Sequence, residues 1–386
     1  MNGRARAVPR GARGPSGFSL VELLVAMAVG LVLTVGTVSV FVANQRSGEL
    51  NDATATMQEN ARFALEGLVA DLRMAGHQGC AALGGGGLNV GAAKAPFPVG
   101  GTGLAAAAVS AALVAEDGWR PTLAFAPPPR GFDPEDADRA VPGSHAIALQ
   151  FGTARTWALA GELATAGVPD PSAPVVTREP VGDGLEAGDL AIVSDCLGAD
   201  LFEVTSVAPA AGGGSAIGHA APANASGSLS IAYGSAPTLL QTRLMRFAAH
   251  VYYVGDTGLV NDAGDPITAL YQQSWPFDDP DNPPTELVQG VERLRVALGV
   301  DDGSGSISYV DPGTTAYAPE DVRSVRLGLL LSSWKRLAGD GDAPTFLLAG
   351  TPVGPAADPA AAAPAYPDDG RFRMAFNTTV KVRNFR

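Results

Sequence analysis

The hydrophobic pattern changes sharply near the amino terminus of the chain. Residues 23–42 contain no charged side chain, and at about 1.5 Å per residue a helix of this length crosses a hydrocarbon layer of about 30 Å. Proline is absent between Pro15 and Pro96, so no helix-breaking residue occurs there. We therefore predict one helix from Phe18 to about Ala75, with a membrane-spanning first half.

The second half of this predicted helix has a different pattern. After Asn44, apolar residues recur at spacings of three and four, and the charged residues fall mostly on other faces. Such spacing places one apolar stripe along a helix. We expect the stripe to pack on a globular domain, and a coiled-coil partner is the alternative. Its members are Ala53, Met57, Ala61, Ala64, Leu68 and Leu72.

The rest of the chain alternates between strand-like runs and turn-rich segments. Residues 84–143 are Gly-rich, then Ala-rich, then Pro-rich, and we expect a long irregular connection with a short helix. Residues 286–292 favour a short helical turn, and the acidic, Pro-rich residues 339–370 favour an exposed loop. Strands are predicted at residues 145–151, 189–194, 201–207, 228–233, 244–254, 293–300, 325–331 and 372–382.

Together these elements predict an α+β fold, in which a long amino-terminal helix packs on an antiparallel β-sheet domain. The expected organisation has five segments. They are a leader at 1–17, a transmembrane half-helix at 18–43, an amphipathic half-helix at 44–76, a connection at 77–143 and a β-rich domain at 144–386.

Composition narrows the classes of partner. Charged residues are 17% of the chain, and 48 glycines and 30 prolines are typical of a loop-rich body with strands. The net charge is −13, and loss of a leader with four arginines would leave 22 basic and 39 acidic residues, or −17. Nucleic-acid binding needs basic patches that displace counterions, so we expect no nucleic-acid partner.

The sequence contains no recognisable catalytic or metal-binding motif. The histidines (His77, His145, His219 and His250) are dispersed, and none has metal-ligand spacing. No Gly-x-Ser-x-Gly, phosphate loop or Cys-x-x-Cys pair occurs. Acidic residues at 278–281 and 301–303 lack the alternation of a calcium loop, so we interpret them as solvated turns, with calcium binding as the alternative. We expect no enzymatic activity, no cofactor and no metal site.

The most specific pattern lies at the start of the apolar run. Residues 1–17 carry four arginines and no acid, which holds this end in the cytoplasm by the positive-inside rule. The run Gly-Phe-Ser-Leu-Val-Glu follows at residues 17–22. A small residue, Gly17, thus precedes the apolar run, whereas an ordinary secretory signal is cleaved after it. A carboxylate such as Glu22 costs about 2.5–3.5 kcal/mol near the bilayer centre and less near the edge, so we expect a partner for it.

This pattern resembles the class III signal of type IV pilins and pseudopilins. The resemblance implies that a prepilin peptidase cuts between Gly17 and Phe18 and that the new terminal amine of Phe18 is methylated. It implies that Glu22 pairs with the terminal amine of a neighbouring subunit in a filament. It also implies a single-pass inner-membrane protein with its carboxy-terminal domain in the periplasm, which enters the pilus on assembly.

Further segments resemble the PilW family of minor pilins. They are residues 60–66, 71–80, 189–196, 199–205, 246–247, 252–254, 287–295, 299–301, 322–331 and 382–384. The resemblance implies a structural minor pilin in a priming or tip complex of the type IV pilus. Its implied partners are other minor pilins, the major pilin and a large tip adhesin. The alternatives are a J-type minor pseudopilin of type II secretion and a pilus-tip adhesin or other binding subunit.

The two cysteines, Cys80 and Cys196, both follow the apolar span and so lie on the exported side. In an oxidising periplasm a single pair is expected to form a disulfide. Two separate buried thiols are the alternative. Closing a loop of about 117 residues would contribute roughly 4–5 kcal/mol in the chain-entropy description.

Overall fold

A computed structural model describes the backbone of most of the chain. The described residues are 18–80, 88–92, 114–116, 120–122, 141, 143–276, 279, 281–312, 321–337, 343–356 and 365–382. They fall into two compact units, Met1–Asp52 and Ala53–Arg386. The predicted leader, including Gly17, lies outside the described residues, as does most of the predicted connection at 77–143.

Helix α1 is one continuous element, Leu20–Met74, of 55 residues. It begins two residues after the predicted start and ends one residue before the predicted end. The helix ends because Gly76 takes a positive φ of 73°, which glycine adopts without strain, and the Gly76 amide donates to Gln150 O at 2.9 Å. The chain then continues beside strand β4 rather than along the helix axis.

The larger sheet of the second unit has seven strands. Their order is β1–β9–β8–β12–β13–β14, and β4 also pairs with β12. All pairs are antiparallel except β1 with β9, which is parallel. The strands are β1 (Leu88–Val90), β4 (Ile147–Ala158), β8 (Leu190–Ser194), β9 (Ala199–Glu203), β12 (Arg243–Val260), β13 (Pro266–Ser274) and β14 (Thr285–Gln289).

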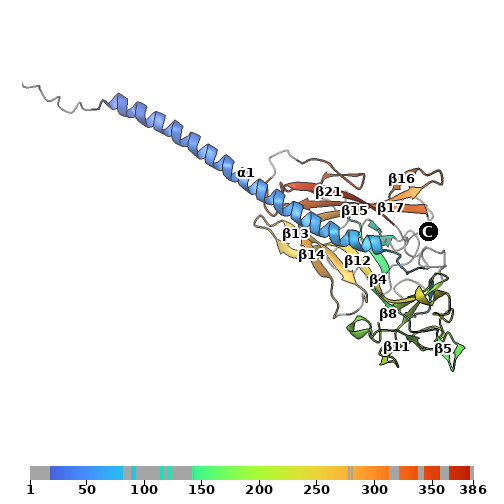
Figure 1. Ribbon diagram of the computed structural model, residues 1–386. Helices are drawn as coiled ribbons and strands as arrows, with labels where there is room; N and C mark the ends of the chain where they lie inside the picture. Colours follow the sequence, from blue (N-terminus) through green and yellow to red (C-terminus); the bar gives the residue numbers. More distant parts are fainter. Residues whose placement is uncertain are drawn as a thin grey trace, which may run out of the picture. The chain divides into compact units, whose positions relative to one another are not determined.

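A four-stranded antiparallel sheet follows in the sequence. Its order is β16–β15–β17–β21. The strands are β15 (Val291–Asp301), β16 (Ile307–Val310), β17 (Val322–Ser332) and β21 (Arg373–Lys381). In Figure 1 the second half of α1 lies across the strands of both sheets.

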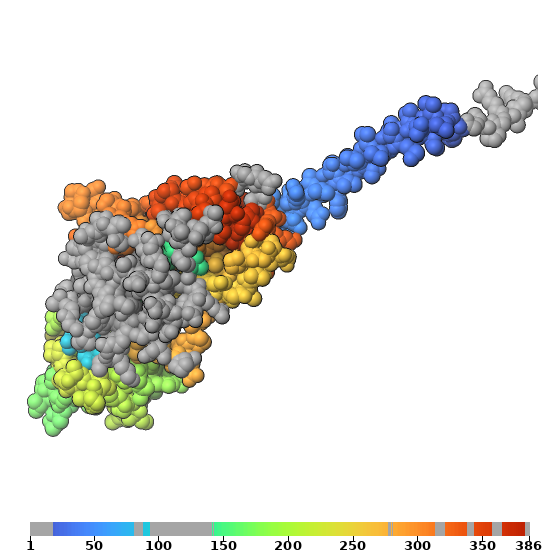
Figure 2. All heavy atoms as spheres, turned by 180° about the vertical axis from the view of Figure 1, so that it is seen from behind, coloured from blue at the N-terminus to red at the C-terminus, as the bar shows by residue number. Residues whose placement is uncertain are grey.

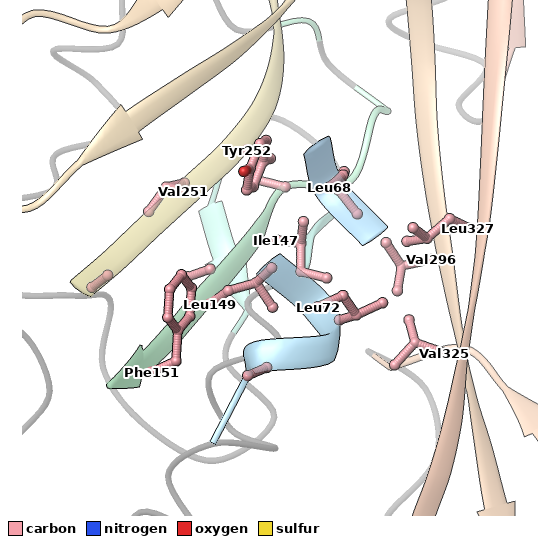
Figure 3. Packing of buried hydrophobic residues seen from close by; sticks show 14 of the residues in the cluster. Leu68, Leu72, Ile147, Leu149, Phe151, Val251, Tyr252, Val296, Val325 and Leu327 are labelled. Carbon is pink, nitrogen blue, oxygen red and sulfur yellow. The ribbon is translucent and has the colours of Figure 1, made fainter. Parts of the chain in front are cut away.

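The main core lies where α1 meets these two sheets. Residues Met57, Ala61, Ala64, Leu68 and Leu72 are buried, and Ala53 is partly buried against them, so the predicted stripe is the packed face. In Figure 3, Leu68 and Leu72 lie between Ile147 and Leu149 of β4 and Val296 and Leu327 of the second sheet. One helix face therefore fills the space between two sheets. The long amino-terminal helix on a large β-sheet domain agrees with the predicted fold class.

A second, separate core lies in residues 157–244. It is formed by side chains such as Trp157, Val175, Phe202 and Tyr233. The segment 157–244 as a whole gives the green to yellow-green part of the surface in Figure 2. The elements here are β5 (Ala164–Thr165), β6 (Val168–Pro169), β7 (Val175–Val176), η1 (Gly182–Gly184), β10 (Ser206–Pro209), β11 (Ser215–Gly218) and η2 (Thr238–Leu240).

A third, small core corrects one prediction. Residues 339–370 were expected to form an exposed loop, yet Leu348, Val353 and Tyr366 are buried there with Leu330. The apolar side chains are sparse in sequence but converge on one face of β17. The strands concerned are β18 (Phe346–Leu348), β19 (Thr351–Ala356) and β20 (Ala365–Pro367). The remaining described strands are β2 (Val114–Glu116) and β3 (Arg120–Thr122), which lie in the predicted irregular connection.

Three further local predictions are wrong. The expected helical turn at 286–292 is strand β14 followed by a turn at Gly290, because Val288 is buried in the sheet. The strand expected at 228–233 is absent because its side chains bond to a buried carboxylate instead. Ser230 Oγ donates to Asp200 Oδ2 at 2.5 Å and Tyr233 Oη at 2.6 Å. The run at 201–207 is split between β9 and β10.

Candidate assembly site on the amino-terminal helix

The first turn of α1 is capped by its own side chains. Ser19 Oγ accepts a hydrogen bond from the Glu22 amide at 3.1 Å, and Ser19 O accepts one from the Leu23 amide at 3.1 Å. Serine followed three residues later by glutamate is the capping-box spacing. The negative side chain of Glu22 also lies in the first turn, where the helix dipole favours it. Ser19 and Glu22 therefore fix where the helix begins, at Leu20, two residues after Phe18.

The first half of α1, which belongs to the first unit, has an apolar and exposed surface. Its 18-residue window of highest hydropathy averages 2.4, and none of that window is buried. The exposed fraction runs from 44% at Val42 to 83% at Phe18. Such a surface is unfavourable in water and needs lipid or protein around it. The exposed side chains are Phe18, Leu20, Val21, Leu23, Leu24, Val25, Met27, Val29, Leu31, Val32, Leu33, Val35, Val38, Val40, Phe41 and Val42.

Polar groups in this span are satisfied within the helix. Thr34 Oγ1 donates to Gly30 O at 2.8 Å, and Ser39 Oγ donates to Val35 O at 2.8 Å. Backbone and hydroxyl groups thus need no water in an apolar layer. The helix continues through Gly30 and Gly36, where an added Cβ would meet no other heavy atom within 4 Å. Among residues 20–42 of the described helix, Glu22 is the only charged side chain.

The second half of the helix is held to the domain by a partly buried polar cluster. Asp71 Oδ2 accepts a hydrogen bond from His250 Nδ1 at 2.5 Å and one from Tyr252 Oη at 2.6 Å. Burial and the neighbouring Asp71 carboxylate raise the pKa of Tyr252 well above its ordinary value, so the phenol keeps its proton and donates. His250 and Tyr252 both belong to β12. This cluster thereby joins α1 to the centre of the larger sheet.

A disulfide lies just past the end of the helix. Cys80 is bonded to Cys196, with Cα atoms 4.5 Å apart and a separation of 116 positions in sequence. Cys196 lies in the turn between β8 and β9, where Asp195 Oδ1 accepts bonds from the Leu197 and Gly198 amides. The structure therefore contains the predicted disulfide and not the alternative of two separate thiols. The disulfide joins the segment just after α1 to the β8–β9 turn of the larger sheet.

The other candidate residues do not assemble into a site. His145 is buried and accepts a hydrogen bond from the Val296 amide at 3.0 Å, while His219 Nε2 contacts Ala173 O at 2.9 Å. Burial lowers the pKa of His77. Asp301 Oδ1 accepts the Gly303 amide at 3.0 Å, as in an ordinary turn. Within the described ranges no three His, Cys, Asp or Glu side chains gather as metal ligands would.

Comparison with known families places this geometry in context. The family model "Type IV Pilus-assembly protein W" matches residues 251–384, from the middle of β12 to just past β21. The model "Prokaryotic N-terminal methylation motif" matches residues 13–38, which include the capped start of α1. The chain thus carries a PilW-type domain over residues 251–384 and the methylation motif at the start of α1. These matches indicate a pilin related to type IV pilus assembly, and the amino-terminal apolar helix and methylation motif fit a membrane-anchored pilin.

Structural and sequence relatives are more distant. A type IV-like pilin from Thermus thermophilus is 21% identical, over 36% of this chain and 68% of that chain, with a TM-score of 0.18. No curated protein sequence is similar enough to this chain to count as a match. The helix and sheets described above are therefore observed in this chain itself. Residues 159–242, which contain most of the second core, lie outside both family matches.

The sequence alone did not reveal the bond between Asp71 and β12. The signal available was weak, since Asp71 adjoins Leu72 of the apolar stripe and is a polar residue at the edge of a packed face. Its partners are 179 and 181 residues away, and no local pattern pairs residues at that separation. The predictions for Glu22 and Phe18, by contrast, depend only on short spacing in the sequence.

Proposed function

We propose that this chain is a structural minor pilin of the PilW family, in the priming or tip complex of a type IV pilus. In this proposal a prepilin peptidase removes residues 1–17, and Phe18 becomes a methylated amino terminus. Glu22 then pairs with the terminal amine of a neighbouring subunit. The partners are other minor pilins, the major pilin and a large tip adhesin, and the chain performs no catalysis.

One observation carries the proposal: a capped helix start with a single carboxylate, followed by a fully exposed apolar span, coincides with a methylation motif. A carboxylate at the edge of a bilayer is costly unless it is paired, and an amine at the new terminus four residues away supplies the matching charge on a neighbour. The disulfide between Cys80 and Cys196 supports an oxidising compartment for the second unit, as in the periplasm. Before assembly the chain is held in the inner membrane by residues 18–43.

Processing is tested by substituting the residue before the cut. Gly17→Leu in the full chain should block removal of the leader, because a side chain replaces the small residue at the scissile bond. Intact mass spectrometry of membrane fractions should show residues 1–17 retained and no added methyl group. Gly30→Ala is the matched control, since a Cβ there meets nothing within 4 Å, and it should be processed normally. Normal processing of Gly17→Leu would contradict the proposal.

Assembly is tested at Glu22. Glu22→Gln keeps the size and the helix cap but removes the charge, so processing should continue while incorporation into pili falls. Glu59→Gln, an exposed carboxylate farther along the same helix, is the control and should assemble as the unmodified chain does. The measurement is the amount of this chain in sheared pili relative to membranes. Equal incorporation of Glu22→Gln would refute the pairing role.

A further inference from the structure

Three large apolar side chains are exposed at one end of the second unit. Leu259 and Val260, at the tip of the β12–β13 hairpin, are 48% and 59% exposed, and Trp334, just after β17, is 43% exposed. We call these three residues the hairpin-tip patch. Lys335 and Arg336 follow Trp334 directly and are also exposed. The hairpin lies in the gold part of the surface in Figure 2.

The patch is held together by hydrogen bonds between the hairpin and the segment after β17. Asn261 Nδ2 donates to Trp334 O at 2.9 Å and to Asp265 Oδ2 at 3.0 Å. Arg336 Nε donates to the same Asp265 oxygen at 2.9 Å. Asn261 is itself buried. The two segments, about seventy residues apart in sequence, are therefore fixed to each other at this end of the unit.

The position of the patch follows from how α1 runs along β12. Cys80 is bonded to Cys196, two residues after Ser194, which pairs with Arg243 at the start of β12. Asp71, nine residues earlier in α1, bonds to His250. Moving toward the start of the helix thus means moving toward the end of the strand, so α1 and β12 are antiparallel.

The same order continues to the hairpin tip. Asn60 Nδ2 donates to Gln289 O at 3.3 Å, and Gln289 pairs with Ala269, which pairs with Gly255 of β12. Ala53 is seven residues before Asn60, or about 10 Å at the helical rise. Val260 pairs with Pro266, three residues along β13 from Ala269, or about 10 Å at the strand rise, because a bulge after Asp256 adds two residues to β12. The hairpin-tip patch therefore lies at the end of the second unit where Ala53 enters it.

Chain length limits how far this end can be from a bilayer. Ten residues, 43–52, separate the apolar span from Ala53. They cover about 15 Å as a helix and at most about 36 Å if fully extended, whichever direction they take. When residues 18–43 lie in a membrane, the hairpin-tip patch is at the end of the domain tethered closest to the surface of that membrane.

We propose that the hairpin-tip patch inserts into the interface of the membrane that anchors the chain. The inference rests on the proposed membrane anchoring and adds a second contact, made by the globular domain. Tryptophan has an apolar ring and a polar N–H and is favoured at the level of lipid headgroups. Lys335 and Arg336 are balanced by Asp262 and Asp265 in the same segments, so we assign the contact to interfacial burial of apolar groups rather than to attraction by anionic lipid.

This contact would orient the domain before assembly and be broken on extraction. A subunit resting on the bilayer presents the exposed face of residues 53–74 of α1 in one direction. Leaving the membrane for a filament then releases the hairpin-tip patch as well as the apolar span. The patch thereby belongs to the membrane-bound state of the chain.

The test uses the processed full chain in vesicles of zwitterionic lipid. Lipids brominated near the top of their acyl chains quench tryptophans that reach that depth. The chain has four tryptophans, so the contribution of Trp334 is the difference between the unmodified chain and Trp334→Phe. The matched reporter combines Trp334→Phe with Leu197→Trp, at an exposed position in the β8–β9 turn near the opposite end of β12.

We expect Trp334 to lose most of its emission in brominated vesicles and the reporter at position 197 to lose none. Replacing Leu259 and Val260 by serine should reduce the quenching of Trp334, because the patch then inserts less deeply. Raising the salt concentration should leave the quenching unchanged. The disulfide of each variant, read on a non-reducing gel, verifies that the domain is folded.

Three results would overturn the inference. Trp334 could be quenched no more than the reporter at position 197, or it could be shielded from aqueous quenchers yet untouched by brominated lipid, which would mean that protein covers it. In both cases the chain still floats with the vesicles, and the proposed anchoring stands. If the processed chain fails to float, the anchoring itself is wrong and this contact falls with it.

Discussion

The bond between α1 and β12 can be measured with a double-mutant cycle at Asp71 and Tyr252. Asp71→Ala removes the acceptor of two hydrogen bonds, from His250 Nδ1 and from Tyr252 Oη, at 2.5 and 2.6 Å. A hydrogen bond to a charged group contributes about 1.5–3 kcal/mol. The side chains of Asp71 and His250 are 20% and 21% exposed, so water partly replaces the lost partner. We expect Asp71→Ala to lower the free energy of unfolding by about 2–3 kcal/mol.

Tyr252→Phe removes one of the two donors and keeps the ring in the core. Its expected cost is about 1–2 kcal/mol, because Asp71 retains the bond from His250. The double variant should cost less than the sum of the two single variants, by a coupling of about 1 kcal/mol. The assay is urea unfolding of the full chain in detergent, with the slope of each transition compared to verify that the same surface is exposed.

A surface pair on the same helix serves as the control. Arg62 Nε lies 3.7 Å from Glu66 Oε1, and both side chains are at least 70% exposed. A cycle on this pair should give a coupling of at most about 0.5 kcal/mol. If the Asp71 and Tyr252 cycle is additive within about 0.3 kcal/mol, the two side chains do not interact in solution and the reasoning from their distance is refuted.

Two other predictions concern the ties that hold the second unit together. Cys80→Ser combined with Cys196→Ser should lower the free energy of unfolding by about 4–5 kcal/mol, since the loop of 116 residues is no longer closed in the unfolded chain; a loss below about 1 kcal/mol would contradict this. Hydrogen bonds from Arg336 hold the pKa of Asp265 below its ordinary 3.8, so its contribution to stability is present above about pH 4 and is lost as the pH falls through the lowered pKa. Asp265→Asn should therefore unfold with less dependence on pH below 4 than the unmodified chain, and identical acid profiles would show that Asp265 is not the titrating group.

Local spacing made the helix predictable. The start of α1 was expected within two residues because the Ser19 and Glu22 spacing, the apolar run and the absence of proline all act over a few residues. The buried stripe followed from the same short-range periodicity. Among strands, β15 and β17 were recognised because each contains a short apolar run, Val296–Val300 and Leu327–Leu331, next to alternating polar and apolar residues.

Long-range interactions explain what sequence reasoning missed. Asp200 draws Ser230 and Tyr233 into hydrogen bonds that replace a strand, and these residues are 30 and 33 positions from it. Tyr366, in a segment of Ala, Pro and Asp, is buried because Arg373 lies over its ring at 4.5 Å and β17 lies beneath. Local composition suggested solvent exposure there, and only the folded chain supplies the partner. The same holds for Asp71, whose partners His250 and Tyr252 are 179 and 181 residues away in sequence.

The antiparallel course of α1 along β12 has a mechanical consequence. A pulling force that reaches residues 53–74 of α1 and acts along their axis would be parallel to β12, so the contacts between this part of the helix and the strand would be loaded in shear, many at once, instead of breaking one by one. Any slippage ends at Cys80, where a covalent link to the sheet stops the helix from being drawn out. Such a subunit transmits tension from α1 to its β-sheet domain while the domain stays folded.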